Sequence, residues 1–344
     1  MKSEFFMRRC FTLAANGHGR VSPNPLVGAV LVVGDKIVAE GYHREYGGPH
    51  AEVNALAQVS DPSVLKKATL YVNLEPCSHH GKTPPCSDLI IAKGIKQVVV
   101  GQKDPNPLVE GRGIAKLRDA GVSVQTGVLE NEAHFLNRRF NTFHTKKRPY
   151  IILKWAVSAD GFMDRIRTGD ERRVYWISHP EAKKLVHLWR SHESAILVGR
   201  KTVENDNPSL TVREIYGQSP QRIAISREGN IPFNFTVMAD KNGVWIYNQT
   251  TEGEEGPNRW IKLPRDNFFG ALMDDLYARK ISSVLVEGGA NILTSFIESG
   301  LWDEARVITS PVKLGDGLSA PTLQKSPDRT YLYGKDRIEE YYHL

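Results

Sequence analysis

His50-Ala51-Glu52 and, further along the chain, Pro76-Cys77-Ser78-His79-His80-Gly81-Lys82-Thr83-Pro84-Pro85-Cys86 form the pattern that decides the fold. One imidazole and two thiols can hold Zn²⁺ in a tetrahedral site and leave its fourth position open for a water, whose pKa falls to about 7. We therefore predict that His50, Cys77 and Cys86 are metal ligands. The prolines beside both cysteines favour fixed, non-helical turns at the ligands.

Glu52 lies near the start of a predicted helix over residues 50–59, so its carboxyl group can sit beside the metal without binding it. In zinc deaminases with an H-x-E signature, such a glutamate moves a proton from the water to a ring nitrogen and then to the departing ammonia. We predict this catalytic role for Glu52. The alternative is that both cysteines are small buried side chains and His50 only caps a helix, which leaves their joint occurrence unexplained.

The chain has 344 residues, which exceeds what one hydrophobic core usually spans, so we expect two domains. It has three cysteines. Two are assigned to metal and Cys10, in an apolar pattern over residues 5–13, is predicted to lie in the core, so no disulfide framework remains. No apolar run is long enough for a signal peptide or a membrane span. We expect a cytoplasmic protein without a membrane partner.

The formal net charge is +6, but the basic residues occur in short pairs such as Lys66-Lys67, Arg138-Arg139 and Arg172-Arg173. Pairs of this kind are usually solvated, and a nucleic-acid partner would need one continuous stripe. We therefore expect no nucleic-acid partner. A phosphorylated small substrate would use the positive charge equally well.

Predicted strands and helices alternate in both halves, as in layered α/β domains. In the first half we predict strands over 26–33, 36–41, 69–73, 97–101 and 122–126 and helices over 4–16, 50–59, 86–93, 111–120 and 129–144. In the second half we predict strands over 150–157, 195–199, 221–225, 244–247 and 284–287, helices over 180–191, 269–280 and 291–299, and a loop over 248–257. Lys146-Lys147-Arg148-Pro149 has the composition of a connector, and we predict domains over 1–146 and 147–344.

Several features of the second half suggest a ligand site, although each has a simpler explanation. Gly288-Gly289 separates a strand from a helix, where backbone can approach a phosphate, but such a pair often makes only a tight turn. Residues 199–202 supply glycine, two cations and a hydroxyl, which also fit a solvated helix start. Asp206 could be only a turn former. Lys154 interrupts an apolar strand, and a buried cation needs a partner or a ligand.

Four motifs together resemble one known family. They are Ser22-Pro23-Asn24-Pro25-Leu26-Val27-Gly28, Gly41-Tyr42-His43 leading to His50-Ala51-Glu52, the run 76–86, and Asp104-Pro105-Asn106-Pro107. They resemble the bifunctional deaminase/reductase family of riboflavin biosynthesis, over nearly the whole chain. The resemblance implies an N-terminal cytidine-deaminase-like α/β/α domain followed by a C-terminal dihydrofolate-reductase-like domain. The long gap between Cys77 and Cys86 differs from the P-C-x-x-C of tRNA and base-editing deaminases.

The resemblance implies two reactions. Zinc-dependent hydrolysis removes the 2-amino group of 2,5-diamino-6-(5-phosphoribosylamino)pyrimidin-4-one, and NADPH then reduces the ribosyl side chain to ribityl. It also implies one Zn²⁺ for each chain, bound NADPH and a homo-oligomer. By matching position, the pyrimidine ribotide would contact Asn24, His43, His79, Lys82, Asp104 and Asn106, with Lys82 placed to meet a phosphate or a ring oxygen.

In the second half the resemblance implies substrate contacts from Lys154, Arg190, Leu210, Arg213 and Glu287. It implies cofactor contacts from Ala156, Trp176, Thr202, Asp206, Gly289, Ala290, Asn291, Ile292, Leu293, Thr294 and Ser295. The arginines suit a substrate phosphate because a guanidinium can bind it with two parallel hydrogen bonds.

The chain departs from the family before Trp176. The family commonly has Gly-x-Ser-x-Trp-Ile-Ser/Thr, whereas residues 169–178 read Gly-Asp-Glu-Arg-Arg-Val-Tyr-Trp-Ile-Ser. The segment is longer and lacks the serine, which puts one substrate hydrogen bond in question. Two alternatives stay open. One is an RNA-editing deaminase, which is disfavoured by the cysteine spacing and by the absence of a basic stripe. The other is a deaminase fused to a reductase-like domain that only binds a ligand, which the departure before Trp176 allows.

Overall fold

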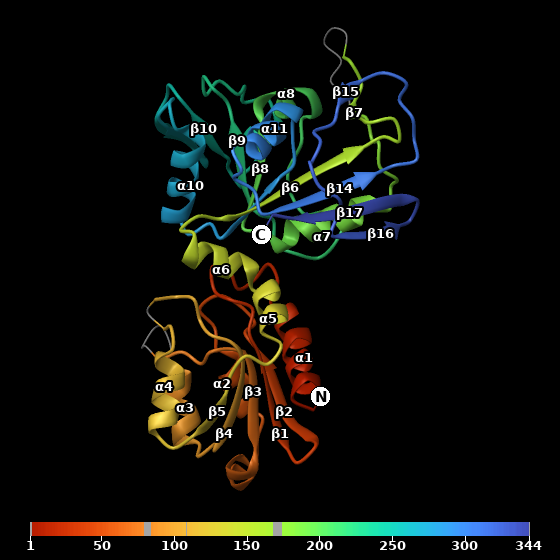
Figure 1. Cartoon of the computed structure of the whole chain (residues 1–344). Helices are drawn as coiled ribbons and strands as arrows, with labels where there is room; N and C mark the ends of the chain where they lie inside the picture. The colour runs from red at the N-terminus through yellow and green to blue at the C-terminus, as the bar shows by residue number, and fades with distance from the viewer. Residues whose placement is uncertain (1, 79–83, 108, 168–173, 344) are drawn as a thin grey trace. The chain divides into compact units, whose positions relative to one another are not determined.

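The computed structural model describes all residues except 1, 79–83, 108, 168–173 and 344. Its contacts divide the chain into two compact units, Met1–Arg148 and Pro149–Leu344 (Figure 1). The division lies inside the predicted connector. Among the described residues, no helix combines the length and the apolar character needed to cross a membrane.

The first unit is a five-stranded sheet in the order β2-β1-β3-β4-β5, covered by helices on both faces (Figure 1). Strand β1 runs antiparallel to β2 and β3, and β3, β4 and β5 are parallel. The elements are α1 (Lys2–Ala15), β1 (Gly28–Val33), β2 (Lys36–Tyr42), α2 (Ala51–Leu56), η1 (Pro62–Lys67), β3 (Thr69–Leu74), α3 (Cys86–Ala92), β4 (Gln97–Gln102), α4 (Arg112–Asp119), β5 (Ser123–Gln125), α5 (Glu130–Leu136) and α6 (Arg138–Thr145).

Alternation along β1 produces the two helical layers. Val30 packs with Met7 and Cys10 of α1, whereas Leu31 points to the other face and packs with Ala55 of α2. Side chains of successive strand residues point to opposite faces, so one apolar strand can serve two cores. Cys10 is fully buried, which confirms that it is a core residue.

The second unit is built on a ten-stranded sheet in the order β11-β12-β10-β9-β8-β13-β6-β14-β17-β16, with β15 and β7 forming a small separate sheet. Its elements are β6 (Tyr150–Val157), β7 (Phe162–Asp164), α7 (Ala182–His192), β8 (Ala195–Gly199), α8 (Arg200–Asp206), β9 (Gln221–Ile225), α9 (Thr236–Ala239), β10 (Trp245–Asn248), β11 (Gly253–Glu255), β12 (Asn258–Lys262), α10 (Phe268–Ala278), β13 (Ser283–Val286), α11 (Ala290–Glu298), β14 (Glu304–Thr309), β15 (Leu318–Ser319), β16 (Arg329–Tyr333) and β17 (Asp336–Tyr342).

Strand β6 lies near the middle of this sheet and is buried on both faces. Leu153 packs in the cluster of Leu272 and Phe296 from α10 and α11, and Ile152 packs in the cluster of Trp189 from α7. In the order of the sheet, the seven strands β12, β10, β9, β8, β13, β6 and β14 are parallel to one another. The central strands β8 and β13 are fully buried and almost entirely apolar, as in a sheet covered on both faces.

Two predicted elements are wrong in detail. The predicted helix over 129–144 is interrupted between α5 and α6 at Asn137, whose side chain accepts a hydrogen bond from the Leu26 N–H (2.8 Å) and donates one to the Leu26 carbonyl (3.0 Å). The predicted loop over 248–257 contains the edge strand β11, which pairs with β12 through its backbone while its own side chains are exposed. A tertiary contact of Asn137 determines the helix break, and backbone pairing determines the strand β11. The pattern of apolar and polar side chains along the sequence indicates neither.

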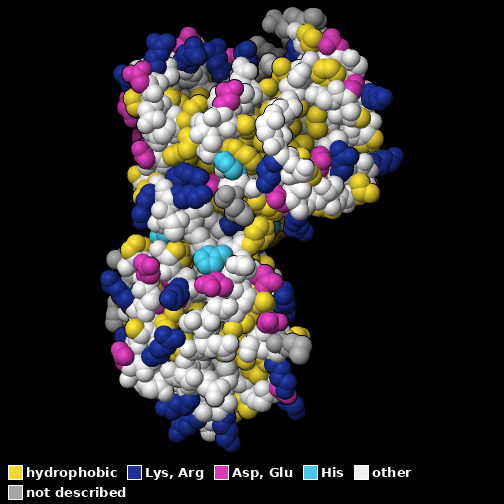
Figure 2. Space-filling model, viewed as in Figure 1, with side chains coloured by type: hydrophobic (Ala, Val, Ile, Leu, Met, Phe, Trp, Pro, Cys, Tyr) yellow, Lys and Arg dark blue, Asp and Glu magenta, His cyan; other side chains and the backbone are white. Residues whose placement is uncertain are grey.

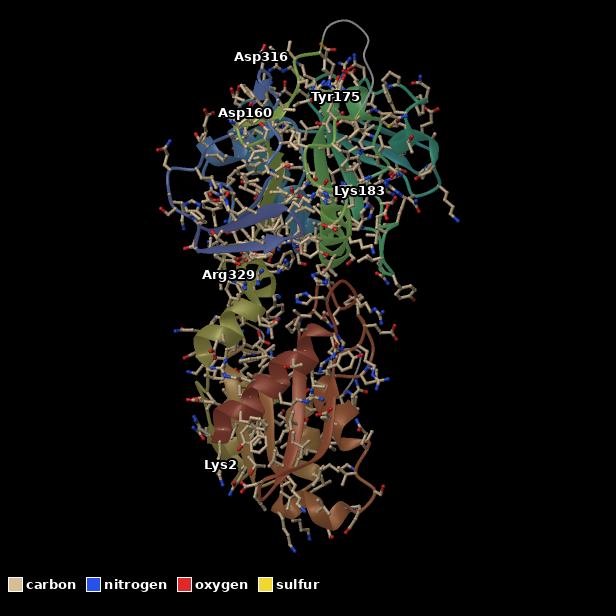
Figure 3. The ribbon with its side chains drawn as sticks, turned by 90° about the vertical axis from the view of Figure 1, so that its right-hand side faces the viewer. Lys2, Asp160, Tyr175, Lys183, Asp316 and Arg329 are labelled. Carbon is tan, nitrogen blue, oxygen red and sulfur yellow. The ribbon has the colours of Figure 1, made fainter. Side chains whose placement is uncertain are left out.

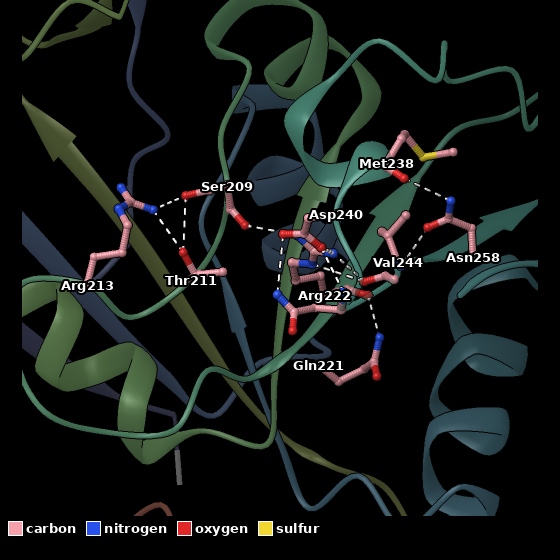
Figure 4. A network of polar contacts seen from close by, with 11 residues as sticks. Ser209, Thr211, Arg213, Gln221, Arg222, Met238, Asp240, Val244 and Asn258 are labelled. Carbon is pink, nitrogen blue, oxygen red and sulfur yellow. Dashed lines mark hydrogen bonds and ion pairs between the residues drawn. The ribbon is translucent and has the colours of Figure 1, made fainter. Parts of the chain in front are cut away.

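Arg222 on β9 is the largest fully buried side chain, with 1% exposure, and its hydrogen bonds join β9 to two loops (Figure 4). Its guanidinium pairs with the Asp240 carboxylate (Nη1 to Oδ2, 2.7 Å). It also donates to the Gly243 carbonyl from Nε (3.0 Å) and Nη2 (2.8 Å) and to the Ser209 carbonyl (3.3 Å). A buried cation is tolerated when it is paired and its donors are used, as they are here.

We predict that Arg222→Gln lowers the free energy of unfolding of the second unit by about 3 kcal/mol, because it removes one partner of a buried pair and strands two carbonyls. All six tryptophans lie at or beyond position 155, so tryptophan fluorescence during urea unfolding reports on this unit alone. The matched control is Arg259→Gln, which removes an exposed ion pair with Glu254 and should cost less than about 1 kcal/mol. Equal losses in the two variants would contradict the structural role of Arg222.

Candidate metal, substrate and cofactor sites

Three sequence-distant segments bring His50, Cys77 and Cys86 together. His50 is the N-cap of α2, Cys77 follows β3, and Cys86 is the first residue of α3. The His50 Nδ1 atom lies 3.5 Å from Cys77 Sγ and 3.3 Å from Cys86 Sγ, and the three ligand atoms all lie within 4.8 Å of one another. A nitrogen and a sulfur bound to one tetrahedral zinc are about 3.5 Å apart. The donor set and its spacing therefore fit Zn²⁺.

The electrostatics of the cluster favour metal binding. Hydrogen bonding with Cys86, followed by hydrogen bonding with His50, lowers the pKa of Cys77 to about 4. The Cys86 backbone N–H also donates to Cys77 Sγ at 3.3 Å. Hydrogen bonding with Cys77, followed by burial, raises the pKa of Cys86. Of this thiol pair, Cys77 therefore presents the thiolate, which is the form in which cysteines bind metals, and Cys86 must lose a proton when a metal binds.

Glu52 lies in the first turn of α2 and is 3% exposed. Burial, and then the negative charge of Cys77, raise the pKa of its carboxyl group. A carboxyl group with a raised pKa beside the metal ligands is suited to accept and return a proton.

Two of the residues assigned to the pyrimidine pocket, Asn24 and His43, are hydrogen-bonded to each other. His43 Nδ1 lies 3.0 Å from the Pro49 carbonyl, which can only accept, so Nδ1 carries the proton. His43 Nε2 then accepts from the Asn24 amide at 3.0 Å. Burial lowers the pKa of His43, consistent with this neutral ring. Both ring nitrogens are used inside the protein, and the ring packs edge-on against His50 with centroids 5.5 Å apart.

Asp104 is buried, and its Oδ1 accepts the Asn106 N–H at 2.8 Å. Burial is the main cause that raises the pKa of Asp104 to about 7. The two remaining residues predicted for this pocket, His79 and Lys82, lie outside the described residues.

Sequence reasoning missed two buried polar residues of β3 and its continuation, Asn73 and Glu75. The Asn73 side chain accepts from the Gly28 N–H (2.7 Å) and donates to the Leu26 carbonyl (2.9 Å). Glu75 accepts four backbone N–H groups, among them that of Asp104. Both interrupt an apolar strand just before Pro76, and this is the kind of signal that singled out Lys154.

The second unit contains a cavity of about 1410 Å³ near the carboxyl ends of its parallel strands. Most residues predicted for the reductase site line it: Lys154, Ala156, Trp176, Arg190, Thr202, Asp206, Leu210, Arg213, Glu287, Gly289, Ala290, Asn291, Ile292 and Ser295. Leu293 instead packs in the core with its side chain fully buried, and Thr294 is not among the lining residues. Ligands of open α/β sheets commonly bind at this edge.

Lys154, Arg190 and Glu287 form a buried charge cluster on the cavity wall. Arg190 donates to both Glu287 oxygens, each at 2.7 Å, and Lys154 Nζ lies 4.0 Å from Glu287 Oε2. Although burial opposes its ionisation, Arg190 and then Lys154 hold the pKa of Glu287 below its usual range. Burial lowers the pKa of Lys154. Arg190 therefore uses one edge of its guanidinium on Glu287.

The glycine pair and Thr202 lie close together on the cavity wall. Gly289 has φ +71° and precedes α11, and a Cβ at Gly288 would lie 3.0 Å from Thr202 Oγ1. The glycines are needed at these two positions for backbone conformation and for close packing.

Asp206, the last residue of α8, accepts a hydrogen bond from Arg167 at 2.7 Å, and Arg167 also donates to Asp164 at 2.9 Å.

Three further residues of the cavity wall were not predicted. His187 Nδ1 accepts a hydrogen bond from the backbone N–H of Arg213 at 3.0 Å. Burial, followed by the charges of Arg190 and Arg213, lowers the pKa of His187 to about 4. Tyr175 and Lys183, labelled in Figure 3, also line the cavity. Lys183 Nζ lies 4.2 Å from the ring centroid of Trp176, a side chain that is 63% exposed. This is a cation–π contact in the segment that departs from the family.

Two family models match the chain: "Cytidine and deoxycytidylate deaminase zinc-binding region" over residues 1–102 and "RibD C-terminal domain" over residues 149–335. Riboflavin biosynthesis protein RibD of Aquifex aeolicus is 42% identical over 341 residues, covering 97% of this chain and 94% of that protein. RibD of Escherichia coli is 37% identical, covering 95% and 94%.

Solved structures agree over the same length. A diaminohydroxyphosphoribosylaminopyrimidine deaminase/5-amino-6-(5-phosphoribosylamino)uracil reductase of Thermotoga maritima is 39% identical, covers 98% of both chains and has a TM-score of 0.84. RibD of Acinetobacter baumannii, at 29% identity, covers 98% of both chains with a TM-score of 0.88. These matches confirm the predicted fold class, a cytidine-deaminase-like unit followed by a dihydrofolate-reductase-like unit. The chain belongs to the RibD family of riboflavin-biosynthesis proteins.

Proposed function

We propose that this chain removes the 2-amino group of 2,5-diamino-6-(5-phosphoribosylamino)pyrimidin-4-one by hydrolysis and then reduces the ribosyl side chain of the product with NADPH. The observation that carries the proposal is the His50, Cys77 and Cys86 triangle with Glu52 beside it, in a chain whose other unit holds a large cavity with a buried cation. Membership of the RibD family supports both activities.

In the first unit, His50, Cys77 and Cys86 would hold the zinc, which supplies a Lewis acid that activates water. Glu52 would transfer one proton from the attacking water to the pyrimidine ring nitrogen, and then a second proton from the added hydroxyl group to the departing amino group, which leaves as ammonia. Neutral His43 orients the Asn24 side chain and supports the His50 ring. Asp104, whose pKa is raised to about 7, and Asn106 bind the polar edge of the pyrimidine.

In the second unit, Thr202, Asp206 and the start of α11 bind the cofactor, and NADPH supplies hydride for C1′ of the opened ribose. Lys154 supplies positive charge beside the reacting carbon and is held by Glu287. Arg213 is the better candidate for the substrate phosphate, because Arg190 already binds Glu287. A guanidinium is suited to phosphate because it can donate two parallel hydrogen bonds.

The proposal extends to the substrate class, the cellular compartment and the oligomeric state. The proposed substrate is a phosphorylated small molecule and not a nucleic acid. On the face that Figure 2 shows, Lys and Arg lie scattered among Asp and Glu, which fits a small substrate. We place the chain in the cytoplasm because two of its three cysteines are proposed metal ligands and none of the three is in a disulfide, which fits a reducing compartment. The family resemblance supports a homo-oligomer, which light scattering of the purified protein would test.

Zinc-loaded protein mixed with the diaminopyrimidinone ribotide and NADPH is expected to release ammonia first and to consume NADPH after it. Ammonia and NADPH absorbance are followed in the same sample. Ammonia without NADPH consumption would mean that the second unit only binds a ligand, as the departure before Trp176 allows. If the protein neither releases ammonia nor consumes NADPH, the substrate assignment is overturned.

Glu52→Gln is expected to lower the rate of ammonia release at least about a hundredfold, because the amide cannot move a proton. The variant should still bind one zinc for each chain, measured by elemental analysis, since Glu52 is not one of the three ligands. Reduction of separately prepared deaminated substrate is the internal control and should not change. Full deamination by Glu52→Gln would remove the proton-transfer role.

Lys154→Met is expected to lower NADPH oxidation about a hundredfold or more, because the buried cation beside Glu287 is lost. Ammonia release from the other unit should persist at the wild-type rate. Lys184→Met, which removes an exposed lysine of α7, is the matched control and should oxidise NADPH normally. Wild-type NADPH oxidation by Lys154→Met would show that Lys154 has no part in reduction.

A further inference from the structure

We propose that Glu75 is a positioning residue of the deamination site, whose carboxylate fixes Asp104 and the start of α4 against the segment that carries Cys77. The inference rests on the proposed deamination. It adds a residue that neither binds the metal nor moves a proton. Its effect is on the substrate-binding side of the pocket.

The Glu75 carboxylate accepts four backbone hydrogen bonds. Oε2 accepts from the N–H groups of Asp104 (3.2 Å) and Gly111 (3.0 Å). Oε1 accepts from those of Gly113 (3.0 Å) and Ile114 (3.1 Å). The side chain is 3% exposed. An ionised carboxylate is the side-chain group that can accept at four positions, and all four are used by the main chain.

Three of these donors lie at the beginning of α4, where backbone N–H groups have no partner inside the helix. Gly111 is the N-cap of α4, with φ +76°, and forms no side-chain cap of its own. Glu75, which is distant in sequence, therefore caps α4 from outside. The negative charge also lies at the positive end of the helix dipole. This arrangement stabilises a helix of only eight residues at one defined position.

The same helix is in close contact with the metal-ligand segment. A Cβ at Gly113 would lie 1.9 Å from the Pro76 carbonyl oxygen, so only glycine allows this approach. Pro76 is followed directly by Cys77, whose carbonyl accepts the Ser87 N–H at 3.1 Å. The metal-ligand turn and the start of α4 are therefore packed backbone to backbone, and Glu75 bonds across the junction.

The fourth donor connects this junction to the substrate pocket. The Asp104 N–H is held by Glu75, and the Asp104 side chain in turn holds the Asn106 N–H. Loss of the Glu75 charge would release the backbone that places both pocket side chains, while His50, Cys77 and Cys86 remain present. Small displacements of binding groups can cost up to about a hundredfold in rate.

The test compares Glu75→Gln with wild type in the full-length, zinc-loaded protein. Glutamine has the same shape but turns an amino group toward two of the four N–H donors. Glu110→Gln is the matched control, because it removes an exposed carboxylate between Asp104 and α4. The measurements are zinc content, kcat and KM for ammonia release, NADPH oxidation with deaminated substrate, and hydrogen exchange of the amides of Asp104, Gly111, Gly113 and Ile114.

We expect Glu75→Gln to keep one zinc for each chain, to raise the KM for deamination about tenfold or more, and to speed exchange at the four amides. NADPH oxidation and the Glu110→Gln variant should match wild type. Wild-type KM in Glu75→Gln, or loss of zinc from that variant, would overturn the proposal. If Glu75→Gln does not fold, Glu75→Asp, which keeps the charge but is too short to span the junction, should raise KM, and a wild-type KM in it would overturn the proposal.

Failure of the proposed function is distinguishable from failure of this inference. If wild type releases no ammonia from the diaminopyrimidinone ribotide, the substrate assignment fails. The hydrogen-exchange comparison still reports on the junction, and unchanged exchange at the four amides in Glu75→Gln would overturn the inference by itself.

Discussion

The deamination site depends on hydrogen bonds between buried polar side chains of β3 and the main chain of neighbouring loops. Asn73 binds the backbone at Leu26 and Gly28, and Glu75 binds the backbone at Asp104 and the start of α4. Buried backbone groups need partners, so each bond both satisfies a loop and places it. Cys77 follows at once, and its position is therefore set together with the loops that surround the substrate.

In the second unit, three charged side chains lie together beside the apolar central strands of the sheet. Lys154 lies on β6, and Glu287 directly follows the neighbouring parallel strand β13. Arg190 of α7 binds Glu287 from the helix side. Removing Glu287 would leave the charges of Lys154 and Arg190 without a counter-charge, which is far more costly than having no charge there. The cavity wall is thus charged and ordered before any ligand binds. Such preorganisation suits a site that must hold an anionic substrate and a cofactor together.

Many of the residues that the structure brings together could be named from the sequence, because the proposed chemistry requires particular side chains at particular spacings. His50, Glu52, Cys77 and Cys86 needed no fold to be recognised, and Lys154 was visible as a cation in an apolar strand. Other assignments needed the structure. The predicted substrate contacts of His43 and Arg190 stay predictions, and the structure adds that the ring nitrogens of His43 bind Asn24 and a backbone carbonyl and that Arg190 pairs with Glu287.

The sequence by itself determined the layered α/β class, the two units and the metal-binding residue types, because periodicity and ligand chemistry are local properties. Tertiary structure decided which polar groups meet. The break at Asn137, the pairing of β11 and the cap that Glu75 supplies to α4 all join residues far apart along the chain or depend on backbone alone. No local sequence pattern specifies such partners. A buried amide or carboxylate must form hydrogen bonds, but which groups it bonds to depends on the tertiary structure.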